Sequence, residues 1–331
     1  GITMTIRNSI RAGLAGLALA ATAAFAAGAQ DYPTKDITHI MPWSAGGGTD
    51  TVMRTFLQYA EEPLGVGIRT QNVTGAQSGV GTLRLMKARP DGYTIGSLTW
   101  DSMITVPYKN LVPGYDTSQL SYLANVTLYP TVLAVNADTG WETLDDFIAA
   151  AKEAPGEVTV SNSGIAGIWH LHALDMADKL GVELNHIPFP NGSAEQREAL
   201  LSGENDAGSL SYATVAGAHD AGQVNILAVM GDKRDPSLPD VPTFKELGYD
   251  VVWGGMRVLA VPAETPDEIK QTLTEAFKAA FDNPEFQEKA AATGMNAYWM
   301  DGAETEAFVQ RTQERATAML DKLKAEGVIG D

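Results

Sequence analysis

The chain has 331 residues, of which 44% are hydrophobic and 19% are charged, and it contains no cysteine. This is the composition of a globular protein rather than a disordered one, and it excludes disulfides, a lipidated cysteine and thiol catalysis. The 41 acidic residues outnumber the 23 basic ones, so the formal net charge is −18, which disfavours binding to nucleic acid or to an anionic membrane surface.

Residues 1–29 have the pattern of a cleavable secretory signal peptide. Arg7 and Arg11 precede an uninterrupted run of apolar and small residues from Leu14 to Ala27, and the small residues Gly28 and Ala29 follow. The run is shorter than the roughly 20 residues that cross a bilayer. We therefore expect an exported protein of the Gram-negative periplasm, in which 21 basic and 41 acidic residues leave a net charge of −20.

Strands and helices then alternate along the chain. Apolar periodicity and turn residues predict strands over residues 37–43, 68–73, 93–99, 131–135, 158–161, 184–189, 224–230 and 251–261. Helices are predicted after Gly48, over 143–154, from about 169 to a C-terminal cap at Gly181, over 193–203, after 265 and over 304–326. Ser193 to Gln196 has the form of a capping box for the fourth of these.

This order predicts an α/β fold in which mainly parallel sheets are flanked by helices. The length suggests about two domains. We expect one lobe to contain residues 30–126 and 253–331 and the other to contain residues 127–252, with the terminal helices packed on the first lobe.

Three junctions between a predicted strand and a predicted helix are rich in glycine and small hydroxyl residues. They read WSAGGGTD at 43–50, NVTGAQSGVG at 72–81 and SNSGIAG at 161–167. Ligands of open α/β sheets bind beyond the carboxyl ends of strands, which is where these junctions lie. Each precedes a helix whose first N–H groups lack intrahelical partners and whose dipole favours an anion.

The three consecutive glycines at 46–48 would let a ligand oxygen reach main-chain N–H groups with no Cβ in the way. Such donors carry no formal charge, so a protein with a net charge of −20 could still bind an acid through them. A glycine-rich turn that binds nothing is the alternative for any one junction. Three such junctions in two lobes favour a binding site, and a ligand held between the lobes could have an acidic group at each end.

Catalytic signatures are weak. The glycines do not fit a dinucleotide-binding pattern, no phosphate-loop lysine follows them, and Ser78 and Ser163 lack a nucleophile-elbow frame. His170 and His172 would point apart on a helix, which favours core positions over a metal site. We therefore expect no enzyme, no cofactor and no metal. The aromatic residues near strand ends either pack in the core or form the walls of a ligand site; they are Trp43, Trp100, Trp169, Tyr212 and Trp253.

Four segments resemble the receptors of tripartite tricarboxylate transporters, the Bug family. They read YPTKDITHIMPWSAGGGTD, NVTGAQSGVG, RPDGYTIG and PSLPDVPTFKELG, and they spread over the chain from Tyr32 onward. The resemblance implies a monomeric periplasmic solute-binding protein whose two lobes close on a ligand like a flytrap. It also implies delivery of the solute to an integral membrane permease.

The resemblance further implies that a carboxylate is held by main-chain donors and ordered waters between loops 43–50 and 74–79, and that the second lobe contacts the rest of the ligand. The expected ligand-binding residues are Trp43, Ser44, Ala45, Gly46, Gly47, Gly48, Thr49, Asp50, Thr74, Gly75, Ala76, Gln77, Ser78, Trp100, Ser163, Gly164, Trp169, Asn191, Ser211 and Tyr212.

Some residues depart from the family pattern. Trp43 and Ser44 stand where the family commonly has Phe and Ala, and Gln77 and Ser78 stand where it commonly has glycines. An organic di- or tricarboxylate is the expected ligand, and an aromatic dicarboxylate resembling terephthalate is the rival because of the tryptophans. Two other functions stay open: an exported enzyme acting on a similar acid, and a sensory receptor for a membrane kinase.

Overall fold

The structure is a computed structural model that describes residues 31–331, so the expected signal peptide lies outside the described residues. The strands are β1 (Ile37–Met41), β2 (Ile68–Asn72), β3 (Thr94–Thr99), β4 (Leu120–Asn136), β5 (Thr159–Asn162), β6 (Asn185–Pro188), β7 (Ala207–Ser211), β8 (Val224–Val229), β9 (Gly254–Pro262) and β10 (Ala297–Asp301). The helices are α2 (Gly48–Leu64), α3 (Gly79–Met86), α4 (Val106–Lys109), α5 (Leu144–Glu153), α6 (Ile168–Leu180), α7 (Ser193–Leu201), α8 (Tyr212–Asp220), α9 (Asp267–Asp282), α10 (Pro284–Thr293) and α11 (Gly302–Ala325). A π-helical turn, η1 (Asp101–Thr105), follows β3, and two short 3₁₀ turns cover 117–119 and 137–139.

The strands form one mixed sheet in the order β2-β1-β3-β9-β4-β7-β5-β6, and β8 and β10 also pair with β4. β1 is parallel to β2 and β3, and β5 is parallel to β6 and β7. Every antiparallel pairing involves β4 or β9. The predicted two-lobe α/β architecture is confirmed, with two parallel strand groups joined through antiparallel strands.

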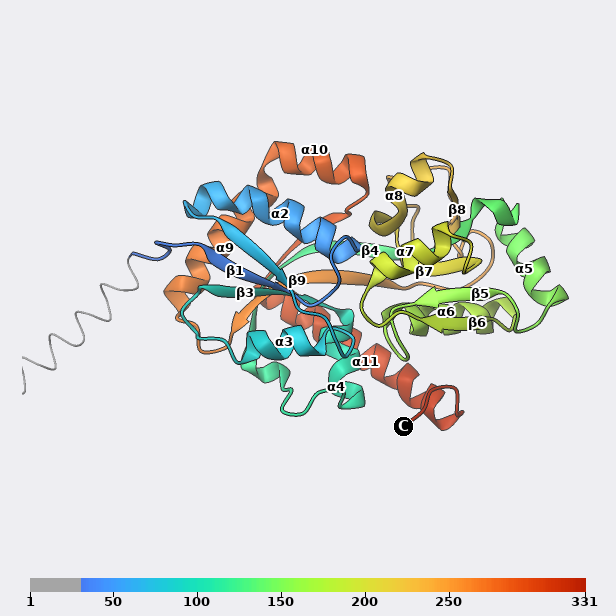
Figure 1. Cartoon of the computed structure of the whole chain (residues 1–331), viewed down its shortest axis with the longest axis horizontal. Helices are drawn as coiled ribbons and strands as arrows, with labels where there is room; N and C mark the ends of the chain where they lie inside the picture. The colour runs from blue at the N-terminus through green and yellow to red at the C-terminus, as the bar shows by residue number, and fades with distance from the viewer. Residues whose placement is uncertain (1–30) are drawn as a thin grey trace, which may run out of the picture.

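Figure 1 shows the elements gathered in two lobes, with the long strand β4 extending from one into the other. One lobe contains β1, β2, β3 and β10 with α2, α3, α9 and α10, and the other contains β5 to β8 with α5 to α8. β4 pairs with β9 and β10 along its first part and with β7 and β8 along its last part. The sheets of the two lobes are therefore joined through the continuous strand β4.

Two strands were missed in the sequence, and one was cut short. β7 and β10 were not predicted, and β4 begins at Leu120 instead of residue 131. The first part of β4 is buried with little alternation and includes the buried polar residues Asn125 and Thr127. A strand covered on both faces lacks the period-two pattern that identifies a half-exposed strand, which explains the error.

Apolar residues fill the space between the sheet and its helices. In the first lobe, Phe56 of α2 packs against Phe286 of α10 with ring centroids 5.2 Å apart and against Phe277 of α9.

Residues 31–331 contain no helix that is both long enough and apolar enough to span a membrane.

Candidate functional site

The lobes meet around a small cavity of about 30 Å³. This volume has room for roughly two water molecules, which is less than a small organic acid occupies. Both lobes contribute to its wall, which is lined by Trp43, Gly47, Thr49, Thr99, Asp101, Tyr129, Ser163, Ile168, Trp169, Gly192, Ser193, Ser211 and Arg257. The cavity lies at the carboxyl ends of β1, β3, β5 and β7, where open α/β sheets bind their ligands.

Asp50 shapes the first glycine-rich loop from within. Its buried carboxylate accepts hydrogen bonds from the Gly46 amide at 3.0 Å, from Arg54 Nε at 2.9 Å and from Asn72 Nδ2 at 2.8 Å. Asn72 Nδ2 also donates to the carbonyl oxygen of Trp43 at 2.8 Å. Asp50 does not line the cavity, and its negative charge is already compensated by these three hydrogen-bond donors. It therefore holds the loop in the conformation that begins α2.

The first loop is hydrogen-bonded directly to the second lobe. The Ser44 amide donates to the Asn191 carbonyl oxygen at 2.9 Å, and Arg197 Nη1 donates to the Gly46 carbonyl oxygen at 2.7 Å. These bonds connect the β1–α2 loop with the segment that leads into α7 and with α7 itself. The lobes are therefore in direct contact on this side of the cavity.

Gly48 lies in close contact with the second lobe. Its amide donates to Ser193 Oγ at 3.0 Å, and a Cβ at this position would lie 2.5 Å from Thr214 Oγ1 and 2.9 Å from Ser211 Oγ. A side chain here would therefore keep the lobes apart. The capping box expected at Ser193 is wrong, because Gly192 is the N-cap of α7 and makes no side-chain cap hydrogen bond. The Ser193 hydroxyl accepts a hydrogen bond from the other lobe instead.

The second glycine-rich loop is strained. Residues 76–78, none of them glycine, all adopt positive φ angles of 48°, 51° and 81°. Side chains are disfavoured in this left-handed region by on the order of 1–2 kcal/mol per residue. Gln77 extends from the loop to the other lobe, where its Nε2 donates to the Ile165 carbonyl oxygen at 3.3 Å. The loop packs against residues 164–167 of the second lobe and does not line the cavity.

Arg257 is the positive charge of the cavity. It comes from β9, only 1% of its surface is exposed, and its guanidinium lies 4.2 Å from the ring centroid of Tyr129. The guanidinium donates to three hydroxyl groups, at 3.2 Å to Thr49, 3.2 Å to Thr127 and 3.3 Å to Ser211. Burial lowers the pKa of Arg257 below its ordinary value. No carboxylate in residues 31–331 forms an ion pair with it.

Asp101 is the negative charge of the same cavity, and it is fully buried on η1. Its Oδ1 accepts from Thr105 Oγ1 at 2.7 Å and from the Ile168 amide at 2.8 Å, and its Oδ2 accepts from Ser163 Oγ at 3.4 Å. Burial raises the pKa of Asp101 to about 6, against the lowering effect of these donors. Because Ile168 begins α6, the N-terminus of that helix is already paired with a carboxylate of the chain.

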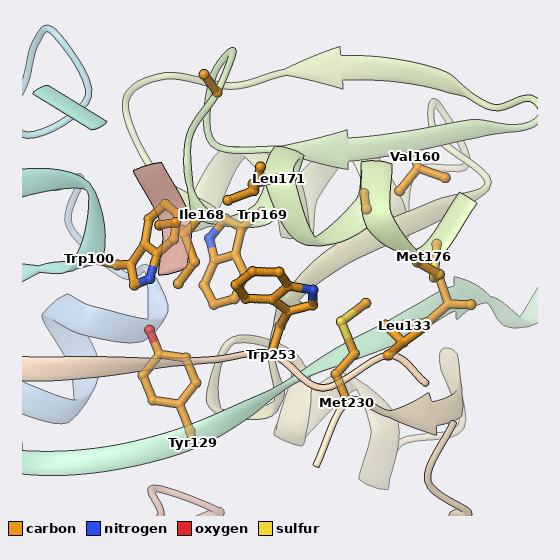
Figure 2. Close-up of a cluster of buried hydrophobic side chains, with 14 of the residues drawn as sticks. Trp100, Tyr129, Leu133, Val160, Ile168, Trp169, Leu171, Met176, Met230 and Trp253 are labelled. Carbon is orange, nitrogen blue, oxygen red and sulfur yellow. The ribbon is translucent and has the colours of Figure 1, made fainter. Parts of the chain in front are cut away.

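Aromatic side chains form part of the cavity wall and of the core behind it. Trp43 donates through Nε1 to Thr99 Oγ1 at 2.9 Å, and Trp169 packs against Tyr129 with ring centroids 5.9 Å apart. Figure 2 shows the Tyr129 hydroxyl pointing toward the side chains of Trp100, Ile168 and Trp169. Trp100 is completely buried but does not line the cavity.

The structure brings only part of the sequence-predicted set to the cavity. The residues that line it are Trp43, Gly47, Thr49, Ser163, Trp169 and Ser211. Those that do not are Ser44, Ala45, Gly46, Gly48, Asp50, Thr74, Gly75, Ala76, Gln77, Ser78, Trp100, Gly164, Asn191 and Tyr212. Several of the latter form the contacts between the loops of the two lobes.

Sequence reasoning missed the two charges of the cavity and some of its polar wall. The residues it missed are Thr99, Asp101, Tyr129, Ile168, Ser193 and Arg257. A signal was present for two of them. Asp101 follows the carboxyl end of a predicted strand, and Arg257 is a lone charge within the apolar stretch of another.

His170 and His172 are buried and make hydrogen bonds within the protein. His172 is fully buried, its Nδ1 lies 2.7 Å from Thr131 Oγ1, and its ring stacks on Trp253 at 4.8 Å. His170 Nδ1 accepts from the Ala166 amide at 2.9 Å, and burial lowers the pKa of His170 to about 4. No group of three or more acidic or histidine side chains suited to a metal ion occurs within residues 31–331.

Known proteins resemble this chain over most of its length. Residues 52–325 match the family described as the tripartite tricarboxylate transporter family receptor. A protein of Cupriavidus necator named "UPF0065 protein in gbd 5′ region" is 32% identical over 319 residues, which cover 96% of each chain. BugT of Bordetella pertussis is 29% identical over 295 residues, covering 87% of this chain and 90% of BugT.

Solved structures agree with these relatives. The periplasmic binding protein BugD is 27% identical and superimposes with a TM-score of 0.80, covering 91% of this chain and all of BugD. A TctC solute-binding protein from Polaromonas is 32% identical with a TM-score of 0.65, covering 88% of this chain and all of that protein.

Proposed function

Because the chain belongs to the tripartite tricarboxylate transporter receptor family, we propose that it is a periplasmic receptor that binds an organic di- or tricarboxylate and delivers it to the permease of such a transporter. The family and the fold are those of substrate-binding proteins. We propose accordingly that the ligand is bound and released without chemical change, and that the receptor acts as a monomer.

The observation that supports this proposal most directly is the Arg257 guanidinium in the cavity between the lobes. A buried charge without an ionic partner is unfavourable, because it has lost its hydration and gained only neutral hydrogen bonds. A ligand carboxylate would supply the missing partner through short, charge-assisted hydrogen bonds. The acid is therefore held by a formal positive charge as well as by main-chain amides, in a protein that is strongly negative overall.

The N-terminus of α2 adds to this binding site. Thr49 lies in the first turn of the 17-residue helix and lines the cavity beside Arg257. The first N–H groups of a helix have no intrahelical acceptor, and its dipole places partial positive charge there. A carboxylate at Arg257 would therefore also be stabilised by this helix end.

The proposed binding cycle includes separation of the lobes. The cavity of about 30 Å³ is too small for a di- or tricarboxylate, so a ligand must enter a more open form. A ligand that contacts both lobes then favours the closed population. We propose lobe boundaries of 30–126 with 253–331 and 127–252, which place the hinge in β4 and at the start of β9.

An aromatic dicarboxylate is the alternative ligand, because Trp43, Tyr129 and Trp169 line the cavity. A thermal-shift screen of the protein purified from the periplasm separates these possibilities. The test acids are succinate, malate, citrate and terephthalate, with leucine and glucose as controls. A ligand that binds only the native state at 100 times its Kd stabilises it by about 2.7 kcal/mol, which is a measurable rise in Tm. A rise in Tm with a control solute but with none of the acids would contradict carboxylate binding.

A further inference from the structure

Two opposite charges line one small cavity and do not pair with each other. Arg257 is 1% exposed and Asp101 is 0% exposed, and both contribute to the cavity wall. No ion pair within 4.0 Å joins them. A ligand that offered only carboxylates would satisfy Arg257 but would bring a like charge toward Asp101, which is costly in a site shielded from water.

Asp101 still has room for another hydrogen-bond donor. A carboxylate accepts about four hydrogen bonds, two at each oxygen. Oδ1 already has two short ones, from Thr105 and from the Ile168 amide, whereas Oδ2 has a single long one of 3.4 Å from Ser163. The under-used oxygen belongs to a side chain that faces the cavity.

The two lobes therefore offer different groups to a ligand in the cavity. In the first lobe, Arg257 has no ionic partner, and the first amide of α2, that of Gly48, donates only to the neutral hydroxyl of Ser193. In the second lobe, the start of α6 is already taken by Asp101, which reaches it from the other side of the cavity. A ligand that offers acid groups alone leaves Asp101 without a hydrogen-bond donor, so a second kind of polar group on the ligand fits this arrangement better.

We propose that Asp101 selects ligands that carry a hydroxyl or ammonium group near the carboxylate bound by Arg257, over unsubstituted dicarboxylates of the same length. The proposal rests on the proposed function and narrows its ligand class to hydroxy- or amino-substituted acids. The substituent donates a hydrogen bond to Asp101 Oδ2. The preference is set by the loss of that bond, since a buried acceptor left without a donor is costly.

Two matched ligand sets test the proposal by calorimetry on the wild-type protein. They are succinate, malate and aspartate, and glutarate, 2-hydroxyglutarate and glutamate. Within a set the carbon skeleton and terminal carboxylates are constant, and only the substituent at carbon 2 changes. A hydrogen bond to a charged group predicts that a substituted acid binds at least about 10-fold more tightly than its unsubstituted parent. The hydroxyl and ammonium members show which donor is preferred.

Asp101→Asn tests the residue itself, because it removes the charge but keeps an oxygen that can accept from the Ile168 amide. Asp145→Asn on the exposed start of α5 makes the same change in net charge away from the cavity. We expect Asp101→Asn to reduce the preference for the substituted acid to about threefold or less, and Asp145→Asn to leave it unchanged. A preference that persists in Asp101→Asn would assign the selection to another group.

Other results would overturn the proposal in distinguishable ways. Equal wild-type affinity for substituted and unsubstituted acids would refute the selection while leaving carboxylate binding intact. An equal loss of affinity for every ligand in Asp101→Asn would show that Asp101 acts only in holding the lobes together. If no acid of either set binds and none in the wider screen raises Tm, the proposed function itself fails.

Discussion

Replacing Arg257 by methionine removes the positive charge of the cavity while keeping a long, flexible side chain. Methionine can fill most of the space beside Tyr129, but it cannot donate a hydrogen bond. The substitution therefore isolates the contribution of the guanidinium. Arg311→Met, on the exposed face of α11, is the matched control for the loss of one arginine.

The expected effect on binding is large. Hydrogen bonds to charged groups contribute about 1.5–3 kcal/mol each, so a guanidinium that holds a carboxylate by two bonds contributes about 3–6 kcal/mol. Because every 1.4 kcal/mol is about tenfold in Kd, the variant should bind at least about 100-fold more weakly. Arg257→Lys keeps the charge but loses the two-pronged geometry, and it should give an intermediate loss.

The expected effect on folding is small, because two contributions oppose each other. The variant loses three hydrogen bonds of 3.2–3.3 Å and the stacking of the guanidinium on Tyr129, which is worth about 2 kcal/mol when desolvated. It gains by no longer burying a charge without an ionic partner, a penalty of several kcal/mol. We expect the free energy of unfolding to change by no more than about 2 kcal/mol.

Isothermal titration calorimetry with the tightest acid from the screen measures the binding, and urea unfolding measures the stability. Arg311→Met should behave as wild type in both. If Arg257→Met bound the acid with wild-type affinity while remaining folded, the ligand carboxylate would not lie at Arg257, and the main support for the proposed function would be lost.

Three further predictions concern lobe closure and pH. Gly48→Ala places a methyl group 2.5 Å from Thr214 Oγ1 and should hold the lobes apart, which X-ray scattering with saturating ligand would detect as a larger radius of gyration. Gly217→Ala, which has open space around it, should leave the radius unchanged. Equal radii for the two variants would contradict this role of Gly48. Burial raises the pKa of Asp101 from its ordinary 3.8 to about 6, so its contribution to stability is complete below pH 3.8 and is lost as the pH rises through 6. Denaturant unfolding should therefore show a loss of stability between pH 4 and pH 8 that is about 2.4 kcal/mol larger in the wild type than in Asp101→Asn, and equal losses would contradict a raised pKa. Burial lowers the pKa of His39 from its ordinary 6.5 to about 3, so its contribution to stability is complete above pH 6.5 and falls with acidification toward pH 3. The variant His39→Gln should therefore lose about 2 kcal/mol less stability than the wild type when denaturant unfolding is measured at pH 7 and at pH 4.5. An equal loss in both proteins would argue against a neutral buried ring.

Local signals in the sequence were sufficient for much of the architecture. The helix from Leu144 to Glu153 and the left-handed glycine cap at Gly181 were both predicted, because caps and apolar periodicity depend on residues within one or two turns. The glycine-rich junctions were likewise recognisable as loops that precede helices. Strand β4 was not, because burial on both faces removed its alternation.

The sequence by itself determined the α/β class, the position of the glycine-rich loops and the membership of a receptor family. Only the tertiary structure decided which groups face the cavity. Arg257 and Asp101 come from distant parts of the chain and approach the same space because β9 and β3 are neighbours in the sheet. Likewise, the start of α6 looked free to bind an acid until folding brought Asp101 to it. Such pairings depend on contacts between residues far apart in the sequence, both within one lobe and between lobes, which no local pattern of residues encodes.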